Sequence, residues 1–230
     1  IPTDVNTNQF TECLMGGSYG GYIADSNAGF AGKNFGQFSP ENGWSRVMFK
    51  DVIPKLFIYC GEVARATDDP IPNAVASIIK VSGIQRVTDC YGPIPYSQVG
   101  KDGQITAAYD SQEQVYNLMF EQLNAAIDVL TQNRTADFSD KADRVYGGNV
   151  TKWIKYANSL KLRMAMRISK VAPAKAQQMA EEAVNHEVGT MTSNDDNAEL
   201  TLVSTNPFEI IMYEYNGGDS RVSADITTYM

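Results

Sequence analysis

Aromatic and amide side chains gather in the first 44 residues of the chain and again near its end. The members of the first group are Tyr19, Tyr22, Phe30, Asn34, Phe35, Asn42 and Trp44. A second loop of the same composition, residues 213–221, adds Tyr215. Such a set suits sugar recognition, because a ring packs against the apolar C–H face of a sugar while amides bond its polar edge. The alternative is that the rings pack onto the protein itself. That alternative is favoured for Trp44, at the start of a predicted helix, and is evenly balanced for Tyr19 and Tyr22.

Groups that could catalyse a reaction are sparse. His186 is the only histidine, so a Ser-His-Asp catalytic triad or a Cys-His catalytic dyad would have to use it. Its position at the end of a predicted helix instead suits an interaction with the helix dipole. The acidic pairs are Asp68 with Asp69, Glu181 with Glu182 and Asp195 with Asp196. Adjacent carboxylates do not face each other across a sugar, as a glycosidase requires. A pair distant in sequence could do so, and a glycoside hydrolase fragment therefore stays an alternative.

Metal and disulfide chemistry have weak support. Residues 193–199, SNDDNAE, could offer oxygen ligands to calcium, but they lack the spacing and glycine of an EF-hand, and a solvated loop is favoured. Otherwise we expect no metal and no cofactor. The three cysteines, Cys13, Cys60 and Cys90, are widely spaced, and we expect buried thiols. One Cys13–Cys60 or Cys60–Cys90 bridge is the alternative in an oxidising compartment.

A structural ion pair is predicted between Asp89 and an arginine. Residues 149–170 predict a long helix, capped by Asn149, whose apolar residues cover more than one face and include Trp153. Arg163 and Arg167 lie one turn apart on this helix. Buried charges need partners, and the arginine fork suits a carboxylate. Asp89 ends an earlier helix beside two prolines, and we hypothesise that it pairs with one of the two arginines. Exposed arginines are the alternative.

Composition sets the class of protein. A chain of 230 residues can bury a sizeable core and usually forms one or two domains. The net charge of −8 disfavours binding to nucleic acid and to anionic membrane surfaces. No apolar run approaches the roughly 20 residues needed to cross a bilayer.

The elements that must position these residues are helical. Apolar spacing predicts helices over residues 44–67, 72–89, 111–132, 149–170 and 173–186. Pro54 should kink or break the first, Asp110 and Ser111 should cap the third, and close packing explains Gly83 inside the second. The third and fourth helices should form an antiparallel pair. Residues 199–203 could form a short strand. The fold class is therefore all-α.

Three segments, in order, carry a family resemblance. They are VTDCYGPIPYS (residues 87–97), YDSQEQVYNLMFEQLNAAIDVL (109–130) and KWIKYANSLKLRMAMRIS (152–169). They resemble motifs of the SusD/RagB family, the nutrient-binding outer-membrane lipoproteins of Bacteroidetes. The resemblance implies tetratricopeptide-like helical hairpins that carry the ligand site on long irregular loops. It also implies a chain that covers the N-terminal part of a longer protein.

The resemblance implies a function without catalysis. Family members bind glycans or other nutrients at the cell surface and pass them to a SusC-type TonB-dependent transporter. They are held on the outer membrane by an N-terminal lipid anchor, which we expect to be missing from this chain, since it begins Ile-Pro-Thr-Asp as a processed or trimmed chain does. We expect residues 1–43 to be a Gly-, Asn- and aromatic-rich loop region and residues 44–230 to be a helical domain, truncated at its C-terminus, the two together making one domain. A helical-repeat scaffold for a protein partner is the other alternative.

Overall fold

The computed structural model of the chain describes residues 17, 19, 20, 22–25, 39, 42–101, 106–199 and 220–222. The chain divides into two compact units, the first made of Ile1–Pro54 with Leu202–Met230 and the second of Lys55–Thr201. The domain boundary predicted at residue 44 stays a prediction. Within the described residues, no helix has the length and apolar character needed to cross a membrane.

The first unit contains a small antiparallel pairing and two short helical segments. Strand β1 (Ile23–Asp25) pairs with β4 (Ser220–Val222), with Ile23 opposite Val222. Helix α2 (Asn42–Ser45) is followed by the π-helix η4 (Met48–Val52), which leads into α3. The break predicted in this helix therefore precedes Pro54. Since Pro54 has no N–H, it cannot donate to the carbonyl four residues before it, and it is tolerated in the first turn of α3.

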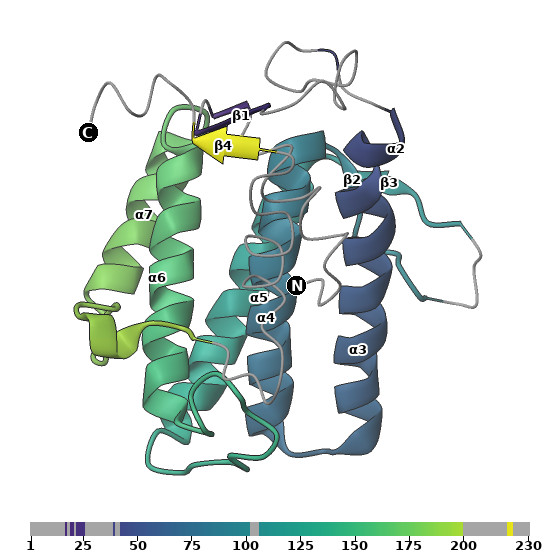
Figure 1. Cartoon of the computed structure of the whole chain (residues 1–230). Helices are drawn as coiled ribbons and strands as arrows, with labels where there is room; N and C mark the ends of the chain where they lie inside the picture. Colours follow the sequence, from purple (N-terminus) through teal and green to yellow (C-terminus); the bar gives the residue numbers. More distant parts are fainter. Residues whose placement is uncertain are drawn as a thin grey trace. The chain divides into compact units, whose positions relative to one another are not determined.

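The second unit is a stack of helices, which confirms the predicted all-α class. The helices are α3 (Ile53–Ala66), α4 (Pro70–Tyr91), α5 (Gln112–Gln132), α6 (Val150–Ile168) and α7 (Pro173–Val184). Successive helices run in alternating directions (Figure 1), and α4 packs on α5, α5 on α6 and α6 on α7. The predicted antiparallel pairing of α5 with α6 is thus confirmed. The arrangement is tetratricopeptide-like.

Side-chain caps fix where three helices begin. Asp69 accepts from the Ile71 N–H (2.9 Å) and starts α4 two residues earlier than predicted. Ser111 and Gln114 form a reciprocal capping box at α5. Asn149 accepts from the Lys152 N–H (2.9 Å), as predicted. The expected role of Asp110 in capping α5 was wrong, because its carboxylate accepts bonds from residues 96 and 97 instead.

The bonds to Asp110 join the proline-rich turn, residues 92–97, to the start of α5. Strand β2 (Ile94–Pro95) pairs antiparallel with β3 (Tyr109–Asp110). Asp110 accepts from the N–H groups of Tyr96 (3.0 Å) and Ser97 (2.7 Å) and from the Ser97 hydroxyl (2.7 Å). These bonds lower the pKa of Asp110 despite the opposing effect of burial. The turn is therefore held to the start of α5 in a single conformation.

Close packing explains the glycine inside α4. Gly83 is buried against Leu56 of α3, and a methyl group added at Gly83 would overlap the Leu56 side chain. The predicted reason for this glycine is confirmed.

Two further expectations need correction. Cys60 is half-buried and its thiol donates to the Ala76 carbonyl (3.2 Å), while Cys90 is exposed. Both keep their thiols, so neither of the bridges considered is formed, and Cys13 lies outside the described residues.

Helix α7 ends at Val184 rather than at His186. Of the strand predicted over residues 199–203, only Glu199 is described, and it belongs to no strand.

Candidate functional site

The predicted binding residues that the structure describes expose their side chains to different degrees. Tyr19 is 45% exposed and Tyr22 is 62% exposed. Asn42 is exposed at the start of α2, and its carbonyl accepts bonds from Ser45 and Arg46. Trp44 is half-buried, in line with the packing alternative. The remaining members lie outside the described residues: Phe30, Asn34, Phe35 and Tyr215. Their shared role in binding stays a prediction.

Trp153 is part of the framework rather than of an open surface. It is 3% exposed, and its indole N–H donates to Asp143 Oδ2 (2.7 Å). Its ring meets those of Tyr146 and Tyr156 edge to face, with centroid distances of 5.1 and 5.7 Å. Tyr146 donates its hydroxyl to the Asp196 carbonyl (2.8 Å), and burial raises its pKa. The predicted structural role of Trp153 agrees with this position.

Asp143 is a residue that the sequence interpretation missed. Its carboxylate is 5% exposed and accepts from the N–H groups of Val145 (2.9 Å), Tyr146 (3.2 Å) and Gly148 (2.9 Å), as well as from Trp153. The stretch from 133 to 148 reads as a polar linker, because no apolar period marks it. An aspartate three residues before an aromatic and five before a glycine was the local signal, since aspartate bonds nearby N–H groups in turns.

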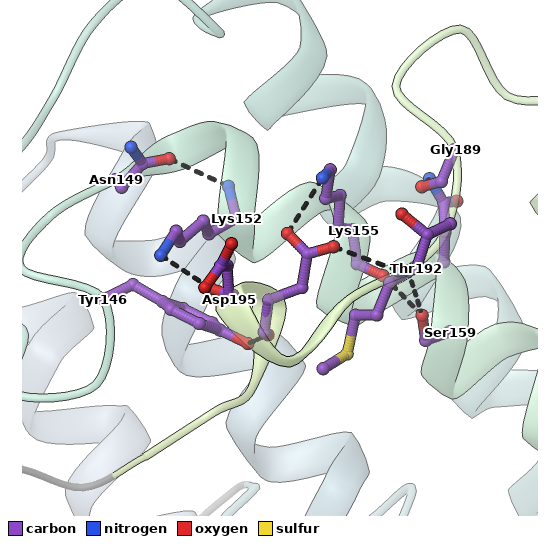
Figure 2. Close-up of polar contacts among 11 residues, drawn as sticks. Tyr146, Asn149, Lys152, Lys155, Ser159, Gly189, Thr192 and Asp195 are labelled. Atoms are coloured by element: carbon purple, nitrogen blue, oxygen red, sulfur yellow. Dashed lines mark hydrogen bonds and ion pairs between the residues drawn. The ribbon is translucent and has the colours of Figure 1, made fainter.

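Side chains of α6 bind the segment that follows α7, residues 189–196 (Figure 2). Lys155 Nζ pairs with Asp196 Oδ1 (2.8 Å), and Asp196 Oδ2 accepts from the Thr192 N–H (3.0 Å). Lys152 Nζ donates to the Asp195 carbonyl (2.8 Å). Bonding to Lys155 holds the pKa of Asp196 below its usual range. This carboxylate, in the segment considered for calcium, is therefore already compensated by an ammonium. The calcium hypothesis stays a prediction.

The polar residues Asn158 and Lys161, buried on α6, have the hydrogen-bond partners that buried polar groups need. Asn158 is 1% exposed and donates to the Gly189 carbonyl (3.0 Å). Lys161 is 5% exposed and its ammonium donates to Glu182 of α7 (2.6 Å), which lowers the pKa of that carboxylate. Within the residues described here, no group of three or more acidic, cysteine or histidine side chains is placed to hold a metal ion.

The structure pairs Asp89 with Arg167, one of the two arginines hypothesised. Arg167 Nε lies 2.5 Å from Asp89 Oδ2, while Arg163 is exposed. Asp89 also accepts from the Tyr116 hydroxyl (2.6 Å) and from the Gln85 amide. Burial, and then the Asp89 carboxylate, raise the pKa of Tyr116 to about 12. One carboxylate thus joins α4, α5 and α6.

Substitution of Asp89 should lower the free energy of unfolding more than substitution of Arg167. We expect Asp89→Ala to lower the free energy of unfolding by about 2 kcal/mol, because the buried Tyr116 and Gln85 lose their acceptor. Arg167→Ala should cost about 0.5–1 kcal/mol, since its side chain is 50% exposed. Urea unfolding followed by circular dichroism measures both. Arg163→Ala is the matched control and should change stability by less than about 0.5 kcal/mol. A loss for Arg163→Ala equal to that for Asp89→Ala would contradict this assignment.

A cavity of about 440 Å³ is the second feature that the sequence interpretation missed. It lies among α3, α4, α5 and the proline-rich turn, and its lining includes Phe57, Ser77, Lys80, Tyr96, Lys101 and Gln122. The rings of Phe57 and Tyr96 meet edge to face at 5.6 Å. Tyr96 donates its hydroxyl to Gln122 Oε1 (2.6 Å), and burial raises its pKa. No local sequence pattern predicts this cavity, because its walls come from segments that are far apart in the chain.

Comparison with known proteins gives a consistent result. The family model described as SusD-like, "Susd and RagB outer membrane lipoprotein", matches residues 1–230. No curated protein matches the chain. Among solved structures, a SusD homologue from Bacteroides uniformis is 51% identical with a TM-score of 0.90, over 99% of this chain and 48% of that one. A SusD homologue from Bacteroides ovatus is 40% identical, with a TM-score of 0.89, over 100% of this chain and 46% of that one.

The similar solved structures also include one named for its ligand. It is a chitin-binding SusD homologue from Flavobacterium johnsoniae, 33% identical with a TM-score of 0.89, and the match covers 97% of this chain and 47% of that one. The chain therefore spans about half the length of the solved relatives it matches.

Proposed function

Because the chain belongs to the SusD-like family of outer-membrane lipoproteins, we propose that it is part of a protein that binds glycans or other nutrients at the bacterial cell surface and does not alter them. The observation that carries the proposal is the family match over the whole chain. The chitin-binding relative supports a glycan as the ligand. Exposed rings at Tyr19 and Tyr22 support stacking on its apolar face.

The framework described above suits a binding protein. Helices α4, α5 and α6 are tied by Asp89, and the residue 189–196 segment is tied to α6 by direct hydrogen bonds. Such a scaffold can hold loops in a preformed arrangement, which reduces the entropy lost when a ligand binds. Binding by stacking and hydrogen bonds needs no cofactor and no covalent step.

Delivery to a transporter completes the proposal. In this proposal the full-length protein is held on the outer membrane by an N-terminal lipid anchor and passes its ligand to a SusC-type TonB-dependent transporter. A pull-down of the full-length protein from outer membranes, followed by mass spectrometry, tests the partnership. Recovery of no TonB-dependent transporter would contradict it.

Chitohexaose is a suitable first probe, with a glycan array to widen the search. We expect Tyr22→Ala and Tyr19→Ala each to weaken binding by about tenfold, because a lost stacking contact is worth roughly 1 kcal/mol or slightly more. Isothermal titration calorimetry measures the change. Tyr59→Ala is the matched control, since Tyr59 is 65% exposed on α3, outside the aromatic loop region. Equal losses for Tyr59 and Tyr22 would contradict the loop site, and release of shortened sugars during incubation would contradict a function without catalysis.

A further inference from the structure

The cavity between α3, α4 and α5 has a charge opposite to that of the chain. The protein carries 27 acidic and 19 basic residues, a net charge of −8. Yet the part of the cavity lining that the structure describes contains two lysines, Lys80 and Lys101, and no aspartate or glutamate. The Asp110 carboxylate accepts from the backbone N–H groups of Tyr96 and Ser97 and from the Ser97 hydroxyl on the turn, so its bonds are made to the cavity wall itself. The cavity is therefore an electropositive site in an acidic protein, which favours an anionic occupant.

Lys80 is the centre of this site. Its ammonium lies 5.4 Å from the Phe57 ring centroid and 5.6 Å from that of Tyr96. Lys80 makes no hydrogen bond or ion pair with the part of the chain that the structure describes. Burial lowers the pKa of Lys80, although the side chain is only half-buried. The neighbouring Cys60 is a neutral thiol, since burial raises its pKa, so it does not supply the missing negative charge. A cation of this kind gains stability when an anion enters.

Neutral hydrogen-bond donors also line the cavity. The Gln122 amide accepts from the Tyr96 hydroxyl through Oε1, which leaves its NH₂ group as a donor. Ser77, on α4, adds a hydroxyl one turn before Lys80. Phe57, Leu118 and Ala76 add apolar surface on the same walls. The lining thus combines one central positive charge with hydrogen-bond donors and apolar area.

We propose that this cavity binds a small organic carboxylate of about the size of a sugar acid, with the carboxylate on Lys80 and the body of the ligand against Phe57 and Tyr96. The volume of about 440 Å³ lies in the range of small-molecule sites, roughly 300–1,000 Å³. The Lys80 ammonium, which lies over both rings, suits one carboxylate, and the apolar walls favour a carbon skeleton, which an inorganic anion lacks. The residues of this site belong to the second unit and are not those of the aromatic loop, and the inference does not rest on the proposed function.

The probe is D-glucuronate, with D-glucose as its neutral counterpart of the same ring size. We expect glucuronate to bind the chain at least about tenfold more tightly than glucose, because a hydrogen bond to a charged group is worth that much. Lys80→Met removes the ammonium and keeps the apolar stem, and it should abolish this difference. Lys80→Arg keeps a cation and should retain part of it. Lys170→Met is the control, since Lys170 is exposed and lies outside the cavity.

The readouts separate this proposal from its alternatives. Calorimetry gives the affinities, and the side-chain amide resonance of Gln122 in the unmodified chain should shift with glucuronate even if Lys80→Met does not fold. Equal binding of glucuronate and glucose, an unmoved Gln122 amide, or full competition by equimolar inorganic phosphate would each overturn the proposal. Tyr22→Ala should leave glucuronate binding unchanged, and Lys80→Met should leave chitohexaose binding unchanged. Failure of one site is therefore distinguishable from failure of the other.

Discussion

Asp143→Ala is expected to lower the free energy of unfolding by about 3–5 kcal/mol, because it removes one buried acceptor from several donors at once. The N–H groups of Val145, Tyr146 and Gly148 and the indole N–H of Trp153 all donate to this carboxylate. Their surroundings are buried: Gly148 and Trp153 both lie in the core. Each donor left without a partner costs about 1–3 kcal/mol, and partial hydration of the loop reduces the sum.

The control for this prediction lies in the same loop. Asp140 is exposed, and Asp140→Ala should change stability by less than about 0.5 kcal/mol. Asp143→Asn should fall between the two, since it keeps one acceptor oxygen but turns an NH₂ group toward N–H donors. Urea unfolding monitored by far-ultraviolet circular dichroism compares the three variants without relying on the fluorescence of Trp153. Similar losses for Asp140→Ala and Asp143→Ala would show that the carboxylate does not organise this turn.

Gly148→Ala is expected to cost at least about 3 kcal/mol, while Gly147→Ala should cost about 1–2 kcal/mol. Both glycines have positive φ angles, 61° at Gly147 and 85° at Gly148, so an L side chain strains either position. Only at Gly148 would the new Cβ overlap the backbone carbonyl of Phe138, which cannot rotate away as a side chain can. Gly148 also accepts from the Phe138 N–H (3.2 Å), so a shift there breaks the bond that closes the loop.

This pair of variants isolates the overlap from the conformational strain. The two residues are adjacent, share the same sign of φ, and differ in what an added methyl group meets, which is nothing within 4 Å at Gly147. Thermal and urea unfolding of both variants measure the difference. Equal losses of stability in the two variants would show that the close approach of Phe138 is not the reason why position 148 needs a glycine.

The partner of Asp89 on α6 is a case in which the tertiary structure decided between two residues that the sequence left open. Arg163 and Arg167 were equivalent candidates for Asp89 by residue type. Helices α4 and α6 run in the same direction (Figure 1), so the end of α4, which carries Asp89, lies beside the end of α6. Arg167 is one turn closer to that end than Arg163, and it forms the pair. The choice therefore followed from the relative direction of two helices, which no local pattern encodes.

The sequence by itself determined what depends on a few neighbouring residues. Apolar spacing set the helices, and Ser111 and Asn149 set two of their starts, because a cap bonds an N–H only two or three positions away. The family followed from three ordered motifs, which the match over the whole chain confirms. Asp143 was equally local but was missed, since a polar turn has no period that distinguishes it from a solvated linker.

Tertiary structure alone decided the surroundings of Lys80. Phe57, Tyr96 and Gln122 come from α3, the proline-rich turn and α5, and only the packing of these elements on α4 brings them around one ammonium. A lysine in the middle of a helix reads as a solvated side chain. Its environment depends on which faces of three other segments meet there, and that is settled by long-range burial rather than by spacing along the chain.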